Sequence, residues 1–167
     1  IPEDELTAIK AELDKNGIKV NSLGSPIGKY PIGNPLEDHL IDLEKAFRAC
    51  EILDTKNIRM FSFFIPKDEC ATDYTDEVIS RLNVMQKLSS ERGIQLCHEN
   101  EKGIYGAVAS RCLEIHQAVP ELGGIFDPAN FVQCGVDTLK AYEMLEDYIE
   151  YFHIKDALFE NSEVVPA

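Results

Sequence analysis

The chain has 167 residues, of which 44% are hydrophobic and 28% are charged, and this composition is ordinary for one soluble globular domain. The formal net charge of −14 argues against a nucleic-acid partner bound through its backbone, which needs clustered lysine and arginine, and it disfavours anionic membrane surfaces. The 5 cysteines are odd in number and form no C-x-x-C pair, which predicts reduced thiols in a cytoplasmic protein.

The first part of the chain alternates between helical and strand patterns. Residues 2–16 predict a helix with its leucines and isoleucine on one face, and residues 18–23 predict a strand. A turn-rich loop then leads to a second amphipathic helix over residues 36–53. The nearly continuous apolar run over residues 58–65 predicts the next strand.

The rest of the chain repeats this alternation. Further helices are expected over residues 75–93, with Thr75 as a capping residue, 105–119 and 137–148. Further strands are expected over residues 94–99, 123–127 and 151–156. Short apolar strands between amphipathic helices predict an α/β domain over residues 1–167, with parallel strands covered by outer helices. A doubly wound sheet and a (β/α)8 barrel both fit, but the first strand is not followed by the G-x-G-x-x-G loop of dinucleotide-binding folds.

Three of the predicted strands end in a side chain that can bind a metal, namely Glu99, Asp127 and His153. The carboxyl ends of parallel strands meet at one edge of the sheet, where active sites are built, so these side chains could surround one divalent cation. Two carboxylates and one imidazole favour Mn²⁺, Mg²⁺ or Co²⁺, with Zn²⁺ as an alternative. The competing interpretation is that these residues only cap helices and form turns.

Three segments in this order carry a resemblance to a known family: LCHENEKGIYG, GGIFDPANF and YFHIKDA. They resemble the xylose isomerase-like TIM-barrel superfamily of sugar-phosphate isomerases and epimerases, which also includes inosose dehydratases and the endonuclease IV type of repair enzyme. The resemblance covers nearly the whole chain and implies a partial TIM barrel made of strands two to six. We therefore expect two unpaired sheet edges and an open apolar flank. Either the natural protein is longer, or a second copy in a homo-oligomer supplies the other strands.

The resemblance also implies the ligands of the metal. In that family a divalent ion is held by a glutamate, an aspartate, a histidine and a second glutamate, and the first three correspond to Glu99, Asp127 and His153. Nothing in this sequence matches the second glutamate. Asn130 stands where several members of the family place a substrate-binding histidine, and its amide is expected to bind a substrate hydroxyl in place of that imidazole. Lys155 shares the strand face of His153 and is expected to contact substrate.

Asp156, which follows Lys155, is expected to orient His153 or Lys155, to bind a second cation or to contact substrate. The alternative for Lys155 and Asp156 is a strand-end salt bridge with a loop cap. The function implied by the resemblance is a divalent-metal-dependent isomerase or epimerase of a sugar or sugar phosphate. It would remove a proton next to a carbonyl through an enediolate, with Glu99 as one acid/base group. Because the partner glutamate is missing, the chain by itself is expected to be impaired. The alternatives are a lyase of the inosose dehydratase type, a nuclease, which the net charge opposes, and a non-catalytic binding protein.

Other polar side chains have structural interpretations. His98 alternates away from Glu99 and is expected to be a buried, hydrogen-bonded histidine. Cys97 is expected to be a buried thiol on the face of Glu99 and not a nucleophile. His39 and His116 are interpreted as surface residues or as hydrogen-bonded structural residues. Glu101 is interpreted as a solvated acid in the loop after the strand, and the alternative is that it contacts substrate.

Overall fold

The protein is described by a computed structural model that covers residues 1–155, 157–160 and 163–165. Its helices are α1 (Glu3–Lys15), α2 (Leu36–Leu53), α3 (Thr75–Ser90), α4 (Ala109–Ala118), α5 (Pro128–Gln133) and α6 (Thr138–Leu145). Single 3₁₀ turns are η1 (Ala71–Tyr74), η2 (Tyr105–Ala107) and η3 (Glu146–Tyr148). The strands of the main sheet are β1 (Leu23–Gly24), β2 (Asn57–Met60), β3 (Gln95–Glu99), β4 (Gly123–Phe126) and β5 (Ile149–Phe152). Near the C-terminus, β6 (Leu158–Glu160) and β7 (Glu163–Val165) form an antiparallel pair.

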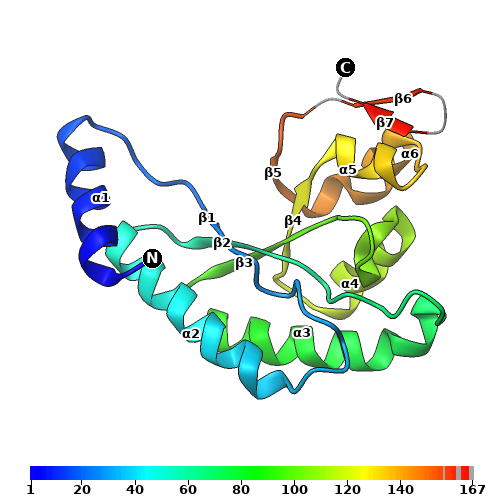
Figure 1. Cartoon of the computed structure of the whole chain (residues 1–167), viewed down its shortest axis with the longest axis horizontal. Coiled ribbons are helices and arrows are strands. Elements are labelled where there is room, and N and C mark those ends of the chain that lie inside the picture. Colours follow the sequence, from blue (N-terminus) through cyan, green and yellow to red (C-terminus); the bar gives the residue numbers. More distant parts are fainter. Residues whose placement is uncertain (156, 161–162, 166–167) are drawn as a thin grey trace.

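The main sheet has 5 parallel strands in the order β1-β2-β3-β4-β5, so each strand pairs with the next one along the chain (Figure 1). A (β/α)8 barrel has this order, whereas a doubly wound sheet reverses direction at a switch point. Four strand spacings would separate the edges of a flat sheet by about 19 Å. However, the hydroxyl groups of Ser22, just before β1, and Tyr151 in β5 lie 3.0 Å apart. The sheet is therefore strongly curved, and the predicted partial barrel is confirmed.

The main hydrophobic core lies between the convex face of the sheet and the helices α2 and α3. Ile58, Met60 and Leu96 point into this core and are fully buried. Because side chains alternate along a strand, Arg59 and Cys97 point to the opposite, concave face. Full burial of one such leucine or isoleucine side chain stabilises the fold by roughly 1.5–3 kcal/mol. The concave face is thus free to carry polar residues.

A second, smaller core lies between α4, α5 and α6, and it includes Phe126, Phe131 and Leu145. The helix α5 is not among the predicted elements, because only a strand end was expected at Asp127. The local signal for it is the Asp-Pro pair. The Asp127 carboxylate accepts a hydrogen bond from the backbone N–H of Asn130 at 2.9 Å, and Pro128 occupies the first turn. The aspartate of the candidate site therefore also starts a helix.

Strand boundaries differ from those predicted. The strand predicted over residues 18–23 is reduced to Leu23–Gly24. The strand predicted over residues 58–65 ends at Met60, because the backbone after it pairs with the loop before α2. There, the N–H groups of Phe61 and Phe63 donate to the carbonyls of Ile27 and Gly28, each at 2.8 Å. Tertiary contacts with this loop thus replace a regular strand ladder.

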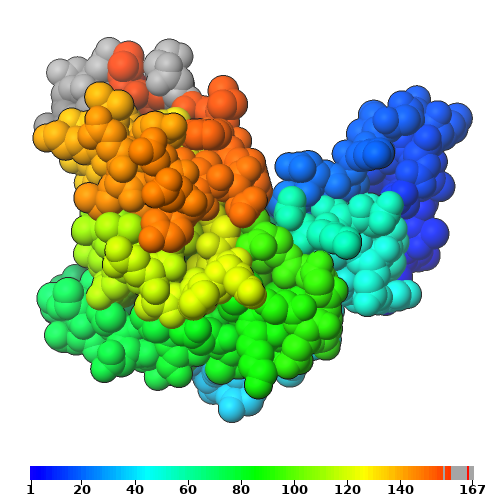
Figure 2. Space-filling view, turned by 180° about the vertical axis from the view of Figure 1, so that it is seen from behind, coloured from blue at the N-terminus to red at the C-terminus, as the bar shows by residue number. Residues whose placement is uncertain are grey.

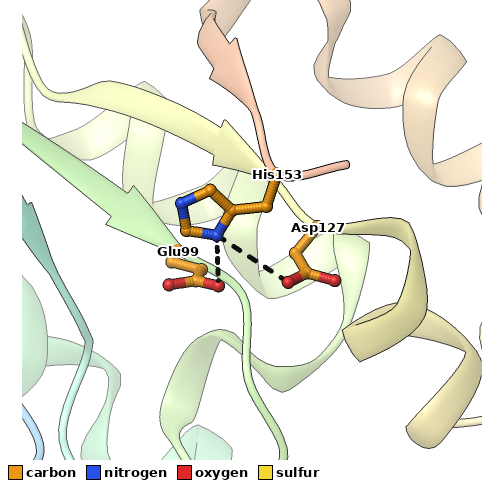
Figure 3. A group of neighbouring side chains, drawn as sticks. All are labelled: Glu99, Asp127 and His153. Atoms are coloured by element: carbon orange, nitrogen blue, oxygen red, sulfur yellow. Dashed lines mark hydrogen bonds and ion pairs between the residues drawn. The ribbon is translucent and has the colours of Figure 1, made fainter. Parts of the chain in front are cut away.

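Two further boundaries are corrected. Thr75 does not cap α3 with its side chain; the cap position is Tyr74, and the Thr75 hydroxyl donates instead to the carbonyl of Thr72 at 3.1 Å. The last strand of the sheet runs over Ile149–Phe152 and not over residues 151–156. His153 consequently lies just beyond the strand end, and its ring points toward Glu99 and Asp127 (Figure 3).

Both edges of the main sheet, β1 and β5, are unpaired among the described residues. Beside β1 runs an open groove of about 760 Å³ between α1, β1 and α2, with Leu6, Leu23, Ile27 and Ala46 among its lining residues. Figure 2 shows the N-terminal segment as a projection beside the rest of the molecule. The expected open flank is therefore apolar and lies on the β1 side of the sheet.

His39 differs from its expected role, because it is neither at the surface nor hydrogen-bonded. It lies fully buried on α2, with its ring centroid 3.9 Å from that of Tyr30 and stacked on Phe63 at 5.4 Å. Neither ring nitrogen has a hydrogen-bond partner among the described residues. Burial, together with the positive charge of Arg81, lowers the pKa of His39 below its ordinary value, although Asp38 and Asp42 oppose this shift.

We predict that His39→Phe raises the free energy of unfolding at pH 7 by about 1 kcal/mol, since two unsatisfied nitrogens are removed from the core. In the wild type, the unfolded chain takes up a proton at His39 below about pH 6.5 before the folded chain does. Stability is therefore lost as the pH falls, and the variant should lose less of it. Urea unfolding at pH 7 and pH 5 measures both effects.

His116→Phe is the control: it should destabilise the protein, because Nδ1 of His116 is hydrogen-bonded to the carbonyl of Leu122 at 3.1 Å. Equal destabilisation by both substitutions would contradict the prediction.

Candidate metal centre

The three predicted ligands come from neighbouring strands. Glu99 is the last residue of β3, Asp127 follows β4 directly, and His153 follows β5 directly. Because β3, β4 and β5 are adjacent and parallel, their carboxyl ends bring the three side chains to one rim. One ligand atom from each residue lies within 4.8 Å of the others. Figure 3 shows the three side chains pointing toward one another.

Within this group the imidazole is the connecting element. Nδ1 of His153 lies 2.9 Å from Oε1 of Glu99 and 3.8 Å from Oδ2 of Asp127. The carboxylates are buried, with 5% and 1% of their side chains exposed, whereas 32% of the His153 side chain is exposed. The group is therefore reached by solvent from the side of the histidine.

Asn130 and Lys155, both predicted to contact substrate, join the same cluster. The Lys155 ammonium lies 2.8 Å from Oδ2 of Asp127 and donates to Oδ1 of Asn130 at 2.9 Å. The Asn130 amide donates to Oε1 of Glu99 at 3.3 Å. Lys155 thus forms the strand-end salt bridge that was its alternative interpretation, while half of its side chain remains exposed (48%). Asp156 lies outside the described residues.

Two residues of the cluster were missed. Asn100 joins the ends of two strands: its amide donates to the Asp127 carbonyl and accepts from the Asp127 N–H, each at 3.2 Å. Arg59 on β2 points its guanidinium at Glu99, with Nη1 3.4 Å from Oε2. A signal existed for both. Asn100 directly follows a predicted ligand, and Arg59 is a single charge in an apolar strand.

The electrostatics of Glu99 reflect both its burial and its neighbours. Burial raises the pKa of this carboxyl, while the imidazole of His153 and the charge of Arg59 oppose the rise and Asp127 adds to it. Its Oε2 is buried and accepts no hydrogen bond from the described residues. A buried carboxylate oxygen without a hydrogen bond destabilises the fold, and a cation bound to this oxygen would remove that cost.

The residues present fit a divalent metal. Glu99, Asp127 and His153 offer two carboxylates and one imidazole, which suit Mg²⁺, Mn²⁺, Co²⁺ or Zn²⁺. Asn130 donates to Glu99 and Lys155 pairs with Asp127, as the outer partners of metal ligands do. Among the described residues no second glutamate joins this group. The open exposure at His153 leaves room for substrate or water to complete the coordination.

The other polar residues mostly follow their structural interpretations. His98 is buried and its Nε2 is hydrogen-bonded to the Ser62 hydroxyl at 2.9 Å, as predicted. Cys97 is buried, and burial raises the pKa of its thiol to about 12, so a thiolate nucleophile is excluded at neutral pH. Glu101 is not simply solvated: it forms an ion pair with Lys29 at 2.6 Å.

Solved structures share this fold at low sequence identity. A probable 3-DHS dehydratase from Bacillus anthracis is 15% identical with a TM-score of 0.77, and the match covers 92% of this chain and 57% of that chain. A 3-keto-D-glucoside 4-epimerase from E. coli is 16% identical with a TM-score of 0.72, and the match covers 92% of this chain and 65% of that chain. A xylose isomerase-like TIM barrel protein from Mycobacterium smegmatis in complex with magnesium is 14% identical with a TM-score of 0.76, and the match covers 100% of this chain and 63% of that chain. The chain therefore spans less than two thirds of each of these structures.

The sequence comparison gives the family directly. No curated protein matches the sequence significantly. The family described as xylose isomerase-like TIM barrel matches residues 1–165, which is nearly the whole chain. The curved parallel sheet in sequential strand order is the architecture of such a barrel. We conclude that the chain belongs to the xylose isomerase-like TIM barrel family.

Proposed function

We propose that the protein is a divalent-metal-dependent isomerase or epimerase of a sugar or sugar phosphate. The observation that carries this proposal is the convergence of Glu99, Asp127 and His153 within 4.8 Å at the rim of the barrel. The epimerase and the magnesium complex among the similar structures support the class of reaction and the type of cofactor. The substrate would be a small carbohydrate, and neither nucleic acid nor membrane is proposed as a partner.

Each residue of the cluster has a role in this proposal. Glu99, Asp127 and His153 would hold the ion, which when bound would polarise the carbonyl and hydroxyl oxygens of the substrate. Glu99 would accept the proton from the carbon next to the carbonyl, since burial raises the pKa of its carboxyl toward the working range of a general base. Lys155, whose side chain is half exposed, would donate hydrogen bonds to substrate hydroxyls. Asn130 is buried and its amide already donates to Glu99 and to the carbonyl of Asn100, so it would instead position Glu99 and Lys155.

A lyase on the same scaffold is the second candidate, and the dehydratase among the similar structures favours it. A dehydratase removes the same proton and then expels a hydroxyl group as water. The residues described for the first step would serve both reactions, so the fate of the substrate separates them.

We also propose that the protein is located in the reducing environment of the cytoplasm and that it can associate with a second copy of itself. All of the cysteines are free, and the buried ones have thiols whose pKa is raised by burial. No helix among the described residues has both the length and the apolarity needed to cross a bilayer. The unpaired edge of β1 and the groove beside it are the surface at which a second copy, or further chain, would complete the barrel.

Proton exchange tests the proposed function, because exchange needs only one base. The chain with Mn²⁺ or Mg²⁺ is incubated with ketoses and inososes in D₂O, and deuterium incorporation is followed by NMR. We expect metal-dependent exchange next to the carbonyl, and Glu99→Gln should slow it by roughly 10²–10⁴-fold. Loss of water from an inosose would identify the lyase. Absence of both metal binding and exchange would overturn the proposal.

A further inference from the structure

Two cations flank one aromatic ring beside the metal centre. The Lys29 ammonium lies 4.2 Å from the centroid of the Phe61 ring, and the Arg59 guanidinium lies 5.2 Å from it. The ring itself is fully buried beneath them. Because the Arg59 guanidinium also lies 3.4 Å from Oε2 of Glu99, this group is continuous with the candidate metal centre.

Among the residues that the structure describes, the charged side chains paired around the centre balance one another before a metal binds. Each carboxylate faces one cation, in the pairs Glu99–Arg59, Asp127–Lys155 and Glu101–Lys29. A divalent ion held by Glu99, Asp127 and a neutral His153 would therefore leave an excess of two positive charges. This local excess would stand within a chain whose formal net charge is −14, so it would focus anions at the barrel mouth.

Arg59 has hydrogen-bonding capacity that the described residues do not use. Its Nε is buried and has no hydrogen-bond partner among them. Its contact with Glu99, at 3.4 Å, is long for a charge-assisted hydrogen bond. A guanidinium presents its donors in a planar fork that matches two oxygens of a carboxylate or a phosphate. The side chain is 30% exposed, so it can be reached by a ligand.

We propose that Arg59 binds an anionic group of the substrate, with the buried Phe61 ring holding the guanidinium in place and Lys29 adding positive charge at the outer edge. This inference rests on the proposed function and narrows it to substrates that carry a carboxylate or a phosphate, such as a sugar acid or a sugar phosphate. A neutral sugar would leave the excess charge unmatched and the guanidinium donors unused.

Binding of small probes tests this inference apart from catalysis. Glycerol 1-phosphate, glycerate and glycerol share a three-carbon skeleton and differ in charge. Isothermal titration of each probe into the chain saturated with Mg²⁺ should show binding of an anion and not of glycerol. Arg59→Gln should weaken anion binding by about tenfold or more, and Arg59→Lys, which keeps the charge without the fork, should weaken it less. Circular dichroism checks that the variants fold.

Arg92→Gln is the matched control, because Arg92 also lies over a phenylalanine, Phe47 at 4.6 Å, and pairs with a glutamate, Glu44, away from the metal centre. It should leave anion binding unchanged. Preference between the first two probes identifies phosphate or carboxylate as the ligand. Equal binding of anions by Arg59→Gln and the wild type, or equal binding of glycerol, would overturn the inference. If Mg²⁺ does not bind, the proposed function fails, and the effect of Arg59→Gln on the metal-free chain still decides this inference.

Discussion

Replacement of Glu99 by glutamine is expected to weaken binding of Mn²⁺ or Mg²⁺ by more than about 100-fold. Loss of an outer partner of a metal ligand commonly lowers affinity 10–100-fold, and loss of a charged ligand should exceed this. Glu99 also contacts the segments that carry the other two ligands. Its Oε1 lies 2.9 Å from Nδ1 of His153 and accepts a hydrogen bond from the amide of Asn130 in α5, the helix that Asp127 caps. Isothermal titration calorimetry measures the affinity directly.

The same loss should be visible in thermal unfolding. An ion at 100 times its dissociation constant stabilises the folded state by about 2.7 kcal/mol, which raises the midpoint of a chain of this size by roughly 5–10 °C. Glu99→Gln should abolish that rise. Glu101→Gln is the matched control, because this carboxylate lies nearby but pairs with Lys29 and is not among the ligands. Asp127→Asn is a second test, since asparagine still caps α5 while the anionic ligand is lost. A metal-induced rise that survives both ligand substitutions would refute the site.

Gly28→Ala is expected to destabilise the protein by roughly 3–5 kcal/mol, the largest effect on folding that we predict. Gly28 has a φ of +83°, and a Cβ there would overlap the carbonyl oxygen of Phe61 and lie 2.5 Å from its carbonyl carbon. The obstruction is backbone, which cannot rotate away as a side chain would. The substitution would also break the pairing of the loop before α2 with the segment after β2, where Phe63 donates to the Gly28 carbonyl.

Two other glycines separate the causes of this effect. Gly17 has a φ of +68° but nothing within 4 Å of its Cβ position, so Gly17→Ala should show the backbone strain alone, about 1 kcal/mol. Gly33 has neither the strained φ nor a close neighbour, and Gly33→Ala should be close to neutral. Chemical denaturation of the three variants gives the comparison. A Gly28→Ala variant as stable as Gly33→Ala would contradict the described packing of the loop.

The sequence predicts the elements better than their ends. The amphipathic helix over residues 36–53 is found as predicted, because its apolar face is regular and its ends are marked locally. The strand before it was overextended, since Ile18 and Val20 alternate with polar residues as in a strand, but residues 18–22 join no strand ladder. The Asn21 carbonyl instead accepts hydrogen bonds from the side chains of Thr55 and Asn57. The helix α5 was missed although Asp127 and Pro128 mark its start, because the same aspartate was interpreted only as a strand-end ligand. His39 was misplaced because helical periodicity does not show which polar residue a loop will cover.

For the candidate site, strand ends and the resemblance both selected Glu99, Asp127 and His153. Alternation along the predicted strand selected Lys155, and the resemblance alone selected Asn130. For Arg59 the local sequence shows only a single charge in an apolar strand, and its contact with Glu99 depends on β2 lying next to β3. The pairing of Lys155 with Asp127 likewise depends on β4 and β5 being neighbours.

The sequence by itself determined the alternation of strands and helices, the sign of the overall charge and the identity of the side chains at the strand ends. These are local properties, set by periodicity and composition. Only the tertiary structure decided that three of those side chains converge within 4.8 Å, that each carboxylate has its own cation, and that Arg59 keeps donors unused beside them. The physical reason is that convergence requires the order and curvature of the sheet, which arise from contacts between residues far apart in the chain.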